Sequence, residues 1–234
     1  MITKIRDDIV SYREMCDAEK VQTLQRGMNY RLSSDYSVIL LSQRPNAPYK
    51  DRVHPDGVTI EYEGHNVSKS SYEHNPKFDD QMPALPSGVY TQNGLFAKAV
   101  DDFKNNKRSA ELVKAYEKIL PGVWSLKGVF ELIDYHIIND GQRNVFRFIL
   151  RLAQNQGINI ETGDKLLSHT RIIPSEVKMQ VWKRDGGACV LCGSKENLHF
   201  DHDLPFSKGG TSLTSRNVRL LCMKHNLEKS SKIE

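Results

Sequence analysis

Residues 189–226 read CVLCGSKENLHFDHDLPFSKGGTSLTSRNVRLLCMKHN, and this stretch decides how the C-terminal part of the chain folds. It begins with Cys189-x2-Cys192 and closes with Cys222-x2-His225. Two x2 pairs of soft ligands suit a tetrahedral Zn²⁺, because each pair forms a tight turn that binds the metal from one side. A module of about 60 residues buries little core, so a structural ion that supplies roughly 10–16 kcal/mol decides whether it folds. The sequence therefore predicts a module stabilised by structural zinc.

The residues between the two pairs predict two strands and a helix. Leu198 and Phe200 alternate with polar residues, which predicts a strand over 198–202 that ends in Asp-His. A turn at 207–210, a second strand over 217–221 and a helix over 223–229 follow. Carboxylate, imidazole and amide groups at such a strand end and helix start can converge on one hard cation. Phosphodiester cleavage needs a base for water and such a cation, but the four zinc ligands alone fit a non-catalytic zinc ribbon equally well.

The order of these residues resembles the HNH nuclease family, whose fold is a ββα-metal unit. The similar residues are Asp201-His202-x2-Pro205-x2-Lys208-Gly209-Gly210, then Asn217, then Cys222-x2-His225-Asn226-x2-Lys229. The resemblance implies that His202 is the general base and that Asn217 orients the loop that carries it. It also implies that Asp201 and Asn226 bind Mg²⁺ or a similar divalent ion, and that Lys229 contacts a phosphate. The products would be a 5′-phosphate and a 3′-hydroxyl.

Two histidines of this stretch have alternative roles. The second zinc pair of the family more often ends in Cys, and its signature often has His where this chain has Asn226. In another register, His225 could therefore bind the catalytic metal. The matching x2 spacing favours zinc. His199 could line the active site beside Asp201, or it could be a partly exposed histidine without a role.

Length, charge and cysteine usage limit the class of protein. The chain has 234 residues, 38% hydrophobic and 26% charged, which suits one medium and one small domain. Its net charge is +4, and the excess lies in residues 171–234, which hold 11 Lys+Arg and 7 Asp+Glu and could attract phosphates. No apolar run approaches 18 residues and the N-terminus has no signal-like core, so we expect no membrane segment. Three of the four cysteines fall in the zinc pattern, which suits a reducing cytoplasm.

The first 153 residues predict a strand-rich α+β domain. The expected elements are helices over 2–27, 93–105 and 109–118, strands over 37–42, 58–62 and 144–152, a long loop over 65–88, and a hairpin of 122–126 with 129–133 through Lys127-Gly128. A linker over 154–173 and a short helix over 176–184 lead into the C-terminal module, residues 174–234.

Several short pieces in this region resemble, in the same order, the SRA family of modified-cytosine readers. They are Tyr49-Lys-Asp51, Asp56-Gly57-Val-Thr-Ile-Glu-Tyr62-Glu63-Gly64, Asp80-Gln81, Asn93-Gly94-Leu95, Val113-Lys-Ala-Tyr116, Trp124-Ser-Leu-Lys-Gly128-Val-Phe-Glu-Leu-Ile-Asp134-Tyr135 and Phe146-Arg-Phe-Ile-Leu150. The resemblance implies a twisted β-sheet or barrel with flanking helices over residues 1–153. It also implies a reader that flips the base out of the DNA helix into a pocket.

The expected base pocket consists of Tyr49, Asp51 and Tyr62. The two aromatic rings would stack on the flipped base, and the carboxylate would accept from the cytosine amino group. Without the resemblance, the tyrosines could equally pack at a strand end and in a loop. The spacing from Tyr49 to Gly57 is one residue longer than in the family pattern. Of the three assignments, that of Asp51 is the one most affected by this difference. Arg147 and Arg151 share one face of the strand over 144–152. This face is either exposed to solvent, or its two arginines contact phosphates.

The sequence thus predicts an endonuclease that cuts double-stranded DNA carrying 5-methylcytosine or a related base, in a restriction system. Two alternatives stay open: an HNH endonuclease for an unmodified sequence, and a zinc-stabilised DNA-binding protein without catalysis. Cutting both strands with one active site per chain suggests a homodimer.

Overall fold

The computed structural model describes residues 8–32, 35–56, 58–66, 77–153, 173–204 and 214–230. Its elements in chain order are β1 (Asp8–Val10), α1 (Tyr12–Ala18), β2 (Met28–Asn29), β3 (Ser37–Leu41), β4 (Arg52–Val53), β5 (Thr59–Glu63), α2 (Gln92–Lys104), β6 (Glu111–Leu120), β7 (Val123–Asn139), β8 (Asn144–Leu152), α4 (Ser175–Arg184), β9 (Leu198–His202), η3 (Ser215–Asn217), β10 (Val218–Cys222) and α5 (Met223–Ser230). Gly57, most of the expected linker (154–172) and the expected turn at 207–210 lie outside the described residues.

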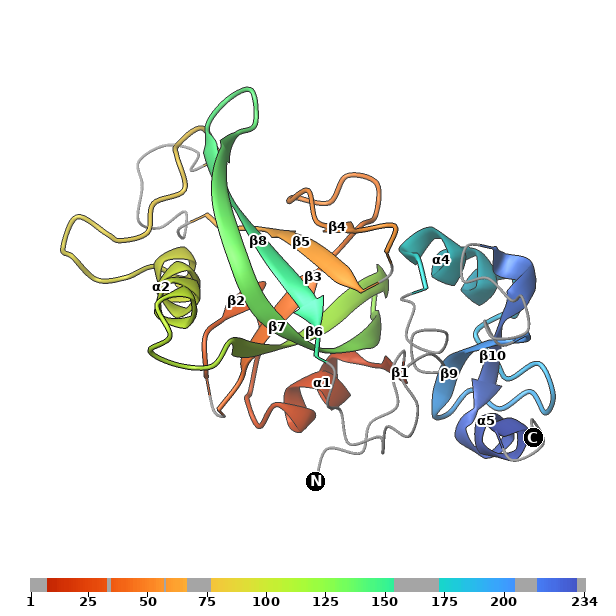
Figure 1. The fold of residues 1–234 in the computed structure, drawn as a ribbon. Helices are drawn as coiled ribbons and strands as arrows, with labels where there is room; N and C mark the ends of the chain where they lie inside the picture. The colour runs from red at the N-terminus through yellow and green to blue at the C-terminus, as the bar shows by residue number, and fades with distance from the viewer. Residues whose placement is uncertain are drawn as a thin grey trace.

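One sheet runs through the described parts of the chain (Figure 1). Its strand order is β10-β9-β1-β7-β6-β3-β2; β8 also pairs with β7, and β5 and then β4 follow β8. The pair β3–β6 is parallel and the other strand pairs are antiparallel. The fold is therefore mixed α+β with a mostly antiparallel sheet, as expected.

Most of the expected elements are confirmed to within a few residues. The strands over 37–42, 58–62, 144–152, 198–202 and 217–221 correspond to β3, β5, β8, β9 and β10. The helices over 93–105, 176–184 and 223–229 correspond to α2, α4 and α5. The cap of α2 is Thr91, whose hydroxyl accepts from the Gly94 amide, because Asn93 itself is buried and binds another loop.

The helix expected over 109–118 is wrong, because this stretch is the strand β6. It pairs with β7 on one edge and with β3 on the other, so the backbone groups of both edges are bonded within the sheet. Its buried charged side chains have partners: Glu111 pairs with the exposed Arg31 at 2.7 Å, and Lys114 with the buried Glu19 at 2.5 Å. These partners lie 80 and 95 residues away along the chain, so local periodicity could not show them.

The hairpin expected through Lys127-Gly128 is also wrong, because β7 runs unbroken through both residues. Ala115 pairs with Gly128 and Tyr116 with Leu126, which makes Lys127 the extra residue of a β-bulge. Gly128 has a φ of +125°, so its conformation serves this bulge instead of a turn. The turn lies earlier, at Gly122, with a φ of +77°.

The helix expected over 2–27 is replaced by the short strand β1 and the shorter helix α1. Strand β1 lies between β7 and β9, so it joins the larger sheet to the C-terminal module (Figure 1). Its side chains alternate accordingly: Val10 packs in a cluster with Trp124, and Ile9 packs against the clusters of the module. Strand β1 thus contributes Val10 to the core beside β7 and Ile9 to the core of the C-terminal module, and so connects the two cores.

A buried ionic cluster, the Glu117 network, makes a second connection between the two parts. It consists of Glu117 of β6, Lys127 and Ser125 of β7, and Lys178 and Ser175 of α4. The Glu117 carboxylate lies 2.6 Å from the Lys127 ammonium and 3.6 Å from that of Lys178. Lys178 donates to Ser125 at 2.9 Å, and Ser175 donates to Glu117. The charged side chains are fully buried, so α4 is fixed to the larger sheet.

Candidate functional site

The three cysteines and His225 meet at one end of the C-terminal module, as expected for structural zinc. Their ligand atoms all lie within 4.8 Å of one another. The sulfurs of Cys192 and Cys222 are 3.8 Å apart, and His225 Nδ1 is 3.5 Å from Cys189 Sγ and 3.3 Å from Cys222 Sγ. A zinc tetrahedron with ordinary bond lengths has edges of roughly 3.8 Å between sulfurs and roughly 3.5 Å between sulfur and nitrogen. The donor set therefore fits Zn²⁺.

The electrostatics of the cluster also favour a metal-binding thiolate. Burial raises the pKa of the Cys189 thiol, but amide groups of Cys222, Leu191 and Cys192 and the His225 ring together lower it to about 6. The thiolate is the form that binds metal. His225 lies among the three cysteines, so the alternative in which it binds the catalytic metal does not match this geometry.

Asp201 and His202 are the last two residues of β9, and both are half-buried. Helix α5 approaches this strand end, because the Lys229 ammonium donates to the Asp201 carboxylate and to the His202 carbonyl. Asn226 lies three residues before Lys229, on the same side of α5. The predicted phosphate contact Lys229 is thus placed beside the predicted metal ligand Asp201 and pairs with it.

Asn217 holds the segment that follows His202. Its side-chain oxygen accepts from the Leu204 amide at 2.8 Å, and its nitrogen donates to the Leu204 carbonyl at 3.0 Å. The Asn217 carbonyl also accepts from the Asp203 amide at 2.8 Å. Asn217 thus fixes the backbone of Asp203 and Leu204, and its loop-orienting role in catalysis stays a prediction. The prediction that His199 is partly exposed is wrong: only 2% of its surface is accessible, on a strand that lies between β1 and β10.

Tyr49, Asp51 and Tyr62 lie close together, as the expected base pocket requires. The pKa of the Tyr62 hydroxyl is raised well above its ordinary value by burial and, next, by the nearby Asp51 and Tyr49. Tyr62 is fully buried, on β5, whereas Tyr49 is half-buried in the loop before β4. The three side chains therefore share one site at the start of the β4–β5 pair.

The Asp51 carboxyl group is bound to the backbone. Its two oxygens accept from the amides of Ser42 at 3.0 Å and Glu63 at 3.1 Å. Burial raises the pKa of Asp51 to about 7, against the lowering effect of these two bonds. The group is therefore present in both protonation states near neutral pH.

Sequence reasoning missed His65, which lies in this pocket. Its ring is stacked on Tyr49, with ring centroids 4.0 Å apart and an interplanar angle of 13°. The Tyr62 centroid is 5.5 Å away at 21°, and the Tyr62 hydroxyl is 2.8 Å from His65 Nε2. Asn93 holds the backbone of His65 through both its amide and its carbonyl group. The only sequence signal was a histidine directly after the Tyr62-Glu-Gly64 piece.

Arg147 and Arg151 differ in their surroundings, although they share a strand face. Arg147 is 5% exposed and donates to the Lys50 carbonyl at 2.6 Å, and it pairs with Glu63 at 3.2 Å. It thus supports the loop that carries Tyr49. The solvated-face interpretation is wrong for Arg147, and Arg151 is exposed.

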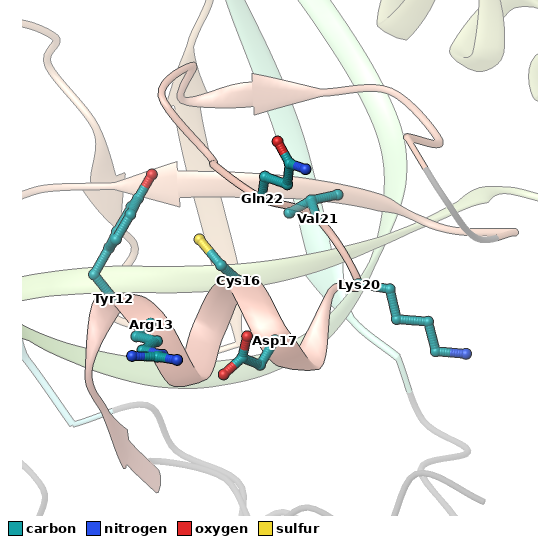
Figure 2. Close-up of a pocket in the computed structure, with 7 residues that line it drawn as sticks. All are labelled: Tyr12, Arg13, Cys16, Asp17, Lys20, Val21 and Gln22. Carbon is teal, nitrogen blue, oxygen red and sulfur yellow. The ribbon is translucent and has the colours of Figure 1, made fainter.

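A surface hollow lies beside α1, away from these residues (Figure 2). It is lined by Tyr12, Arg13, Cys16, Asp17, Lys20, Val21 and Gln22. None of the predicted site residues lines it. Among the described residues, no helix combines the length and the apolar character needed to cross a bilayer.

No protein-family model and no curated protein sequence matches this chain. Similar solved structures are the SUVH5 SRA domain with hemimethylated CG DNA (TM-score 0.45, 16% identity, 69% of this chain and 96% of that one) and with fully hydroxymethylated CG DNA (TM-score 0.46, 16% identity, 69% and 97%). Arabidopsis thaliana SUVH6 with SAM is also similar (TM-score 0.42, 16% identity, 73% and 28%). TM-scores below 0.5 establish neither fold nor function, so the proposals below depend on the residues of this chain.

Proposed function

We propose that this chain is a modification-dependent DNA endonuclease. Residues 1–153 would form an SRA-like reader of 5-methylcytosine or a related base, and residues 174–234 an HNH-like nuclease. The observation that carries the proposal is that one continuous sheet holds two sites: the pocket of Tyr49, Asp51 and Tyr62, and the Asp201-His202 strand end beside a zinc-type cluster. DNA would thus be recognised and cut by parts with a fixed relative position.

In the reader, Asp51 would recognise the cytosine edge. Cytosine presents an amino donor beside a ring-nitrogen acceptor. A carboxyl group with a pKa of about 7 can accept from the amino group in either protonation state, and its protonated form also donates to the ring nitrogen. Thymine has the opposite pattern at these two positions, so it would be rejected. The aromatic rings of Tyr49 and Tyr62 would offset the stacking lost when the base leaves the helix.

In the nuclease, His202 would take the proton of the attacking water. Asp201 and Asn226 offer the oxygen ligands that Mg²⁺ prefers, and such an ion would neutralise charge on the phosphate and the leaving oxygen. Asn217 would keep the segment after His202 in place through its two bonds to Leu204. Lys229 would exchange its bond to Asp201 for a phosphate oxygen.

A plasmid cleavage assay tests both sites together. We expect Mg²⁺-dependent cutting of a cytosine-methylated plasmid and little cutting of its unmethylated copy. His202→Ala should abolish cutting while zinc content and DNA affinity stay unchanged, and Tyr49→Ala should abolish the preference for the methylated plasmid. Equal cutting of both plasmids by the unmutated protein would favour an HNH endonuclease for an unmodified sequence.

The Lys229–Asp201 pair favours a second candidate, a zinc-stabilised DNA-binding protein without catalysis. A cation at this strand end needs the Asp201 carboxylate, which Lys229 already neutralises. Lys229→Met separates the two candidates. In a nuclease it should raise the affinity for Mg²⁺, because the carboxylate is released. If neither the unmutated protein nor this variant cuts DNA with Mg²⁺ or Mn²⁺, the binding protein is the correct description.

A further inference from the structure

We propose that the His65 side chain is a displaceable plug of the base pocket: it fills the site in the DNA-free protein, and a flipped base enters by expelling it. The inference rests on the proposed function of the pocket. It adds His65 as a residue that lowers the affinity of the pocket for any flipped base.

The stacking geometry leaves no room for a base beside the His65 ring. At a centroid distance of 4.0 Å, the rings of His65 and Tyr49 are in direct contact. The His65 ring also lies against Tyr62, which is fully buried. A base that stacks on Tyr49 from this side must therefore replace the imidazole.

The shape of the pocket fits the imidazole ring of His65. A Cβ atom at Gly27 would lie 2.0 Å from His65 Cε1, so the ring occupies a notch that only glycine leaves open. The Tyr62 hydroxyl lies 2.9 Å from the Gly27 carbonyl and 2.8 Å from His65 Nε2. The second contact is a hydrogen bond to the ring in which either group can be the donor. The ring is thus positioned by stacking, by shape and by one hydrogen bond.

The backbone of His65 is held independently of its ring. The Asn93 side chain accepts from the His65 amide at 2.9 Å and donates to its carbonyl at 2.8 Å. Rotation about the side-chain torsions can therefore remove the ring while the Gly64-His65 backbone stays attached to α2. Burial lowers the pKa of His65 to about 4, so the ring is neutral while it lies in the pocket. Its departure therefore breaks no ion pair.

Two variants should open the pocket by different routes, and a third should keep it closed. His65→Ala removes the ring, and Gly27→Ala fills the notch so that the ring must move. His65→Phe keeps a stacked ring of similar size. The binding probes are a duplex with one 5-methylcytosine and the same duplex with an abasic site there. The abasic duplex brings no base into the pocket, so it reports general changes in DNA affinity.

We expect His65→Ala and Gly27→Ala each to bind the methylated duplex roughly 5- to 100-fold more tightly, since the base no longer has to break one stacking contact and one hydrogen bond. His65→Phe should bind it no more tightly than the unmutated protein, and the abasic duplex should show no change. Unchanged or weaker binding by the first two variants overturns the plug, as does an equal gain on the abasic duplex.

The ring signals of His65 in NMR spectra separate this inference from the proposed function. Addition of the methylated duplex should move them from ring-shifted positions to those of a solvated histidine. If the unmutated protein prefers methylated DNA while these signals stay unchanged, the plug is wrong and the reader stands. If it shows no preference, the reader is wrong and the plug falls with it.

Discussion

Replacing Glu117 with Gln is expected to lower the free energy of unfolding by about 3–5 kcal/mol. The Glu117 side chain is fully buried and lies 2.6 Å from the Lys127 ammonium and 3.6 Å from that of Lys178. Glutamine keeps the volume but removes the negative charge that both lysines share. Two ammonium groups then remain in a site from which water is excluded, and their desolvation is no longer offset.

Replacing Lys178 with Met should cost far less, about 0–2 kcal/mol, although it touches the same network. It removes a charge-assisted bond to Ser125, worth roughly 1.5–3 kcal/mol, but it also removes one buried ammonium, and the closer Glu117–Lys127 pair survives. In the double variant only one lysine lacks the carboxylate. The double variant should therefore be more stable than the two single effects added together, by about 1 kcal/mol or more.

Urea unfolding of the three variants and the unmutated protein measures these differences. Trp124 of β7 and Trp182 of α4 report the two sides of the network, so variants that keep one tryptophan show whether both sides unfold together. The reasoning is refuted if Glu117→Gln is as stable as the unmutated protein, or if Lys178→Met is the more damaging of the two.

Four further predictions concern the sites. Purified protein should contain one zinc per chain, and Cys222→Ser or a strong chelator should unfold the module, because roughly 10–16 kcal/mol of binding energy is lost; an apo form with unchanged circular dichroism contradicts this. Burial raises the pKa of Asp51 from 3.8 to about 7, so between these pH values the folded state keeps a proton that the unfolded state has lost. The free energy of unfolding should therefore fall by up to about 4 kcal/mol as the pH rises from about 4 to 7. Unfolding of Asp51→Asn across that range should lack this slope. Asn217→Ala should lower the proposed cleavage rate about 10- to 100-fold with unchanged zinc content, since the two bonds to Leu204 are lost; an unchanged rate argues against a positioning role. Affinity for methylated DNA should rise about tenfold between pH 7.5 and 5.5, because expelled His65 takes up a proton, and His65→Ala should not show this gain.

The strands with regular alternation could be predicted from the sequence, and the strands with buried charges could not. In β8, Phe146, Phe148, Leu150 and Leu152 recur at every second position and Arg147 and Arg151 lie on the opposite face, so the pattern alone indicates a strand. In β6, Lys114 and Glu117 are buried beside partners that come from Glu19 after α1, from β7 and from α4. A local pattern cannot show that a charge has a partner elsewhere.

The zinc-type cluster could be predicted from the sequence, because the two ligands of each pair are only three residues apart in the chain. Each x2 pair sets its own turn, and only one further contact was needed to bring the pairs together. The predicted base pocket is different, because Tyr49 and Asp51 come from the loop before β4 and Tyr62 comes from β5. Their approach depends on supports such as Arg147, which bonds the Lys50 carbonyl and was expected on a solvated face.

The sequence by itself determined the four candidate zinc ligands, the strand that ends in Asp201-His202 and most strands with one apolar face, because these depend on residues that are neighbours in the chain. Only the tertiary structure decided that β1 joins two cores, that Lys127 is the extra residue of a bulge, and that His65 lies on Tyr49. Each of these depends on contacts between distant segments, and burial changes what a charged or aromatic side chain can do there.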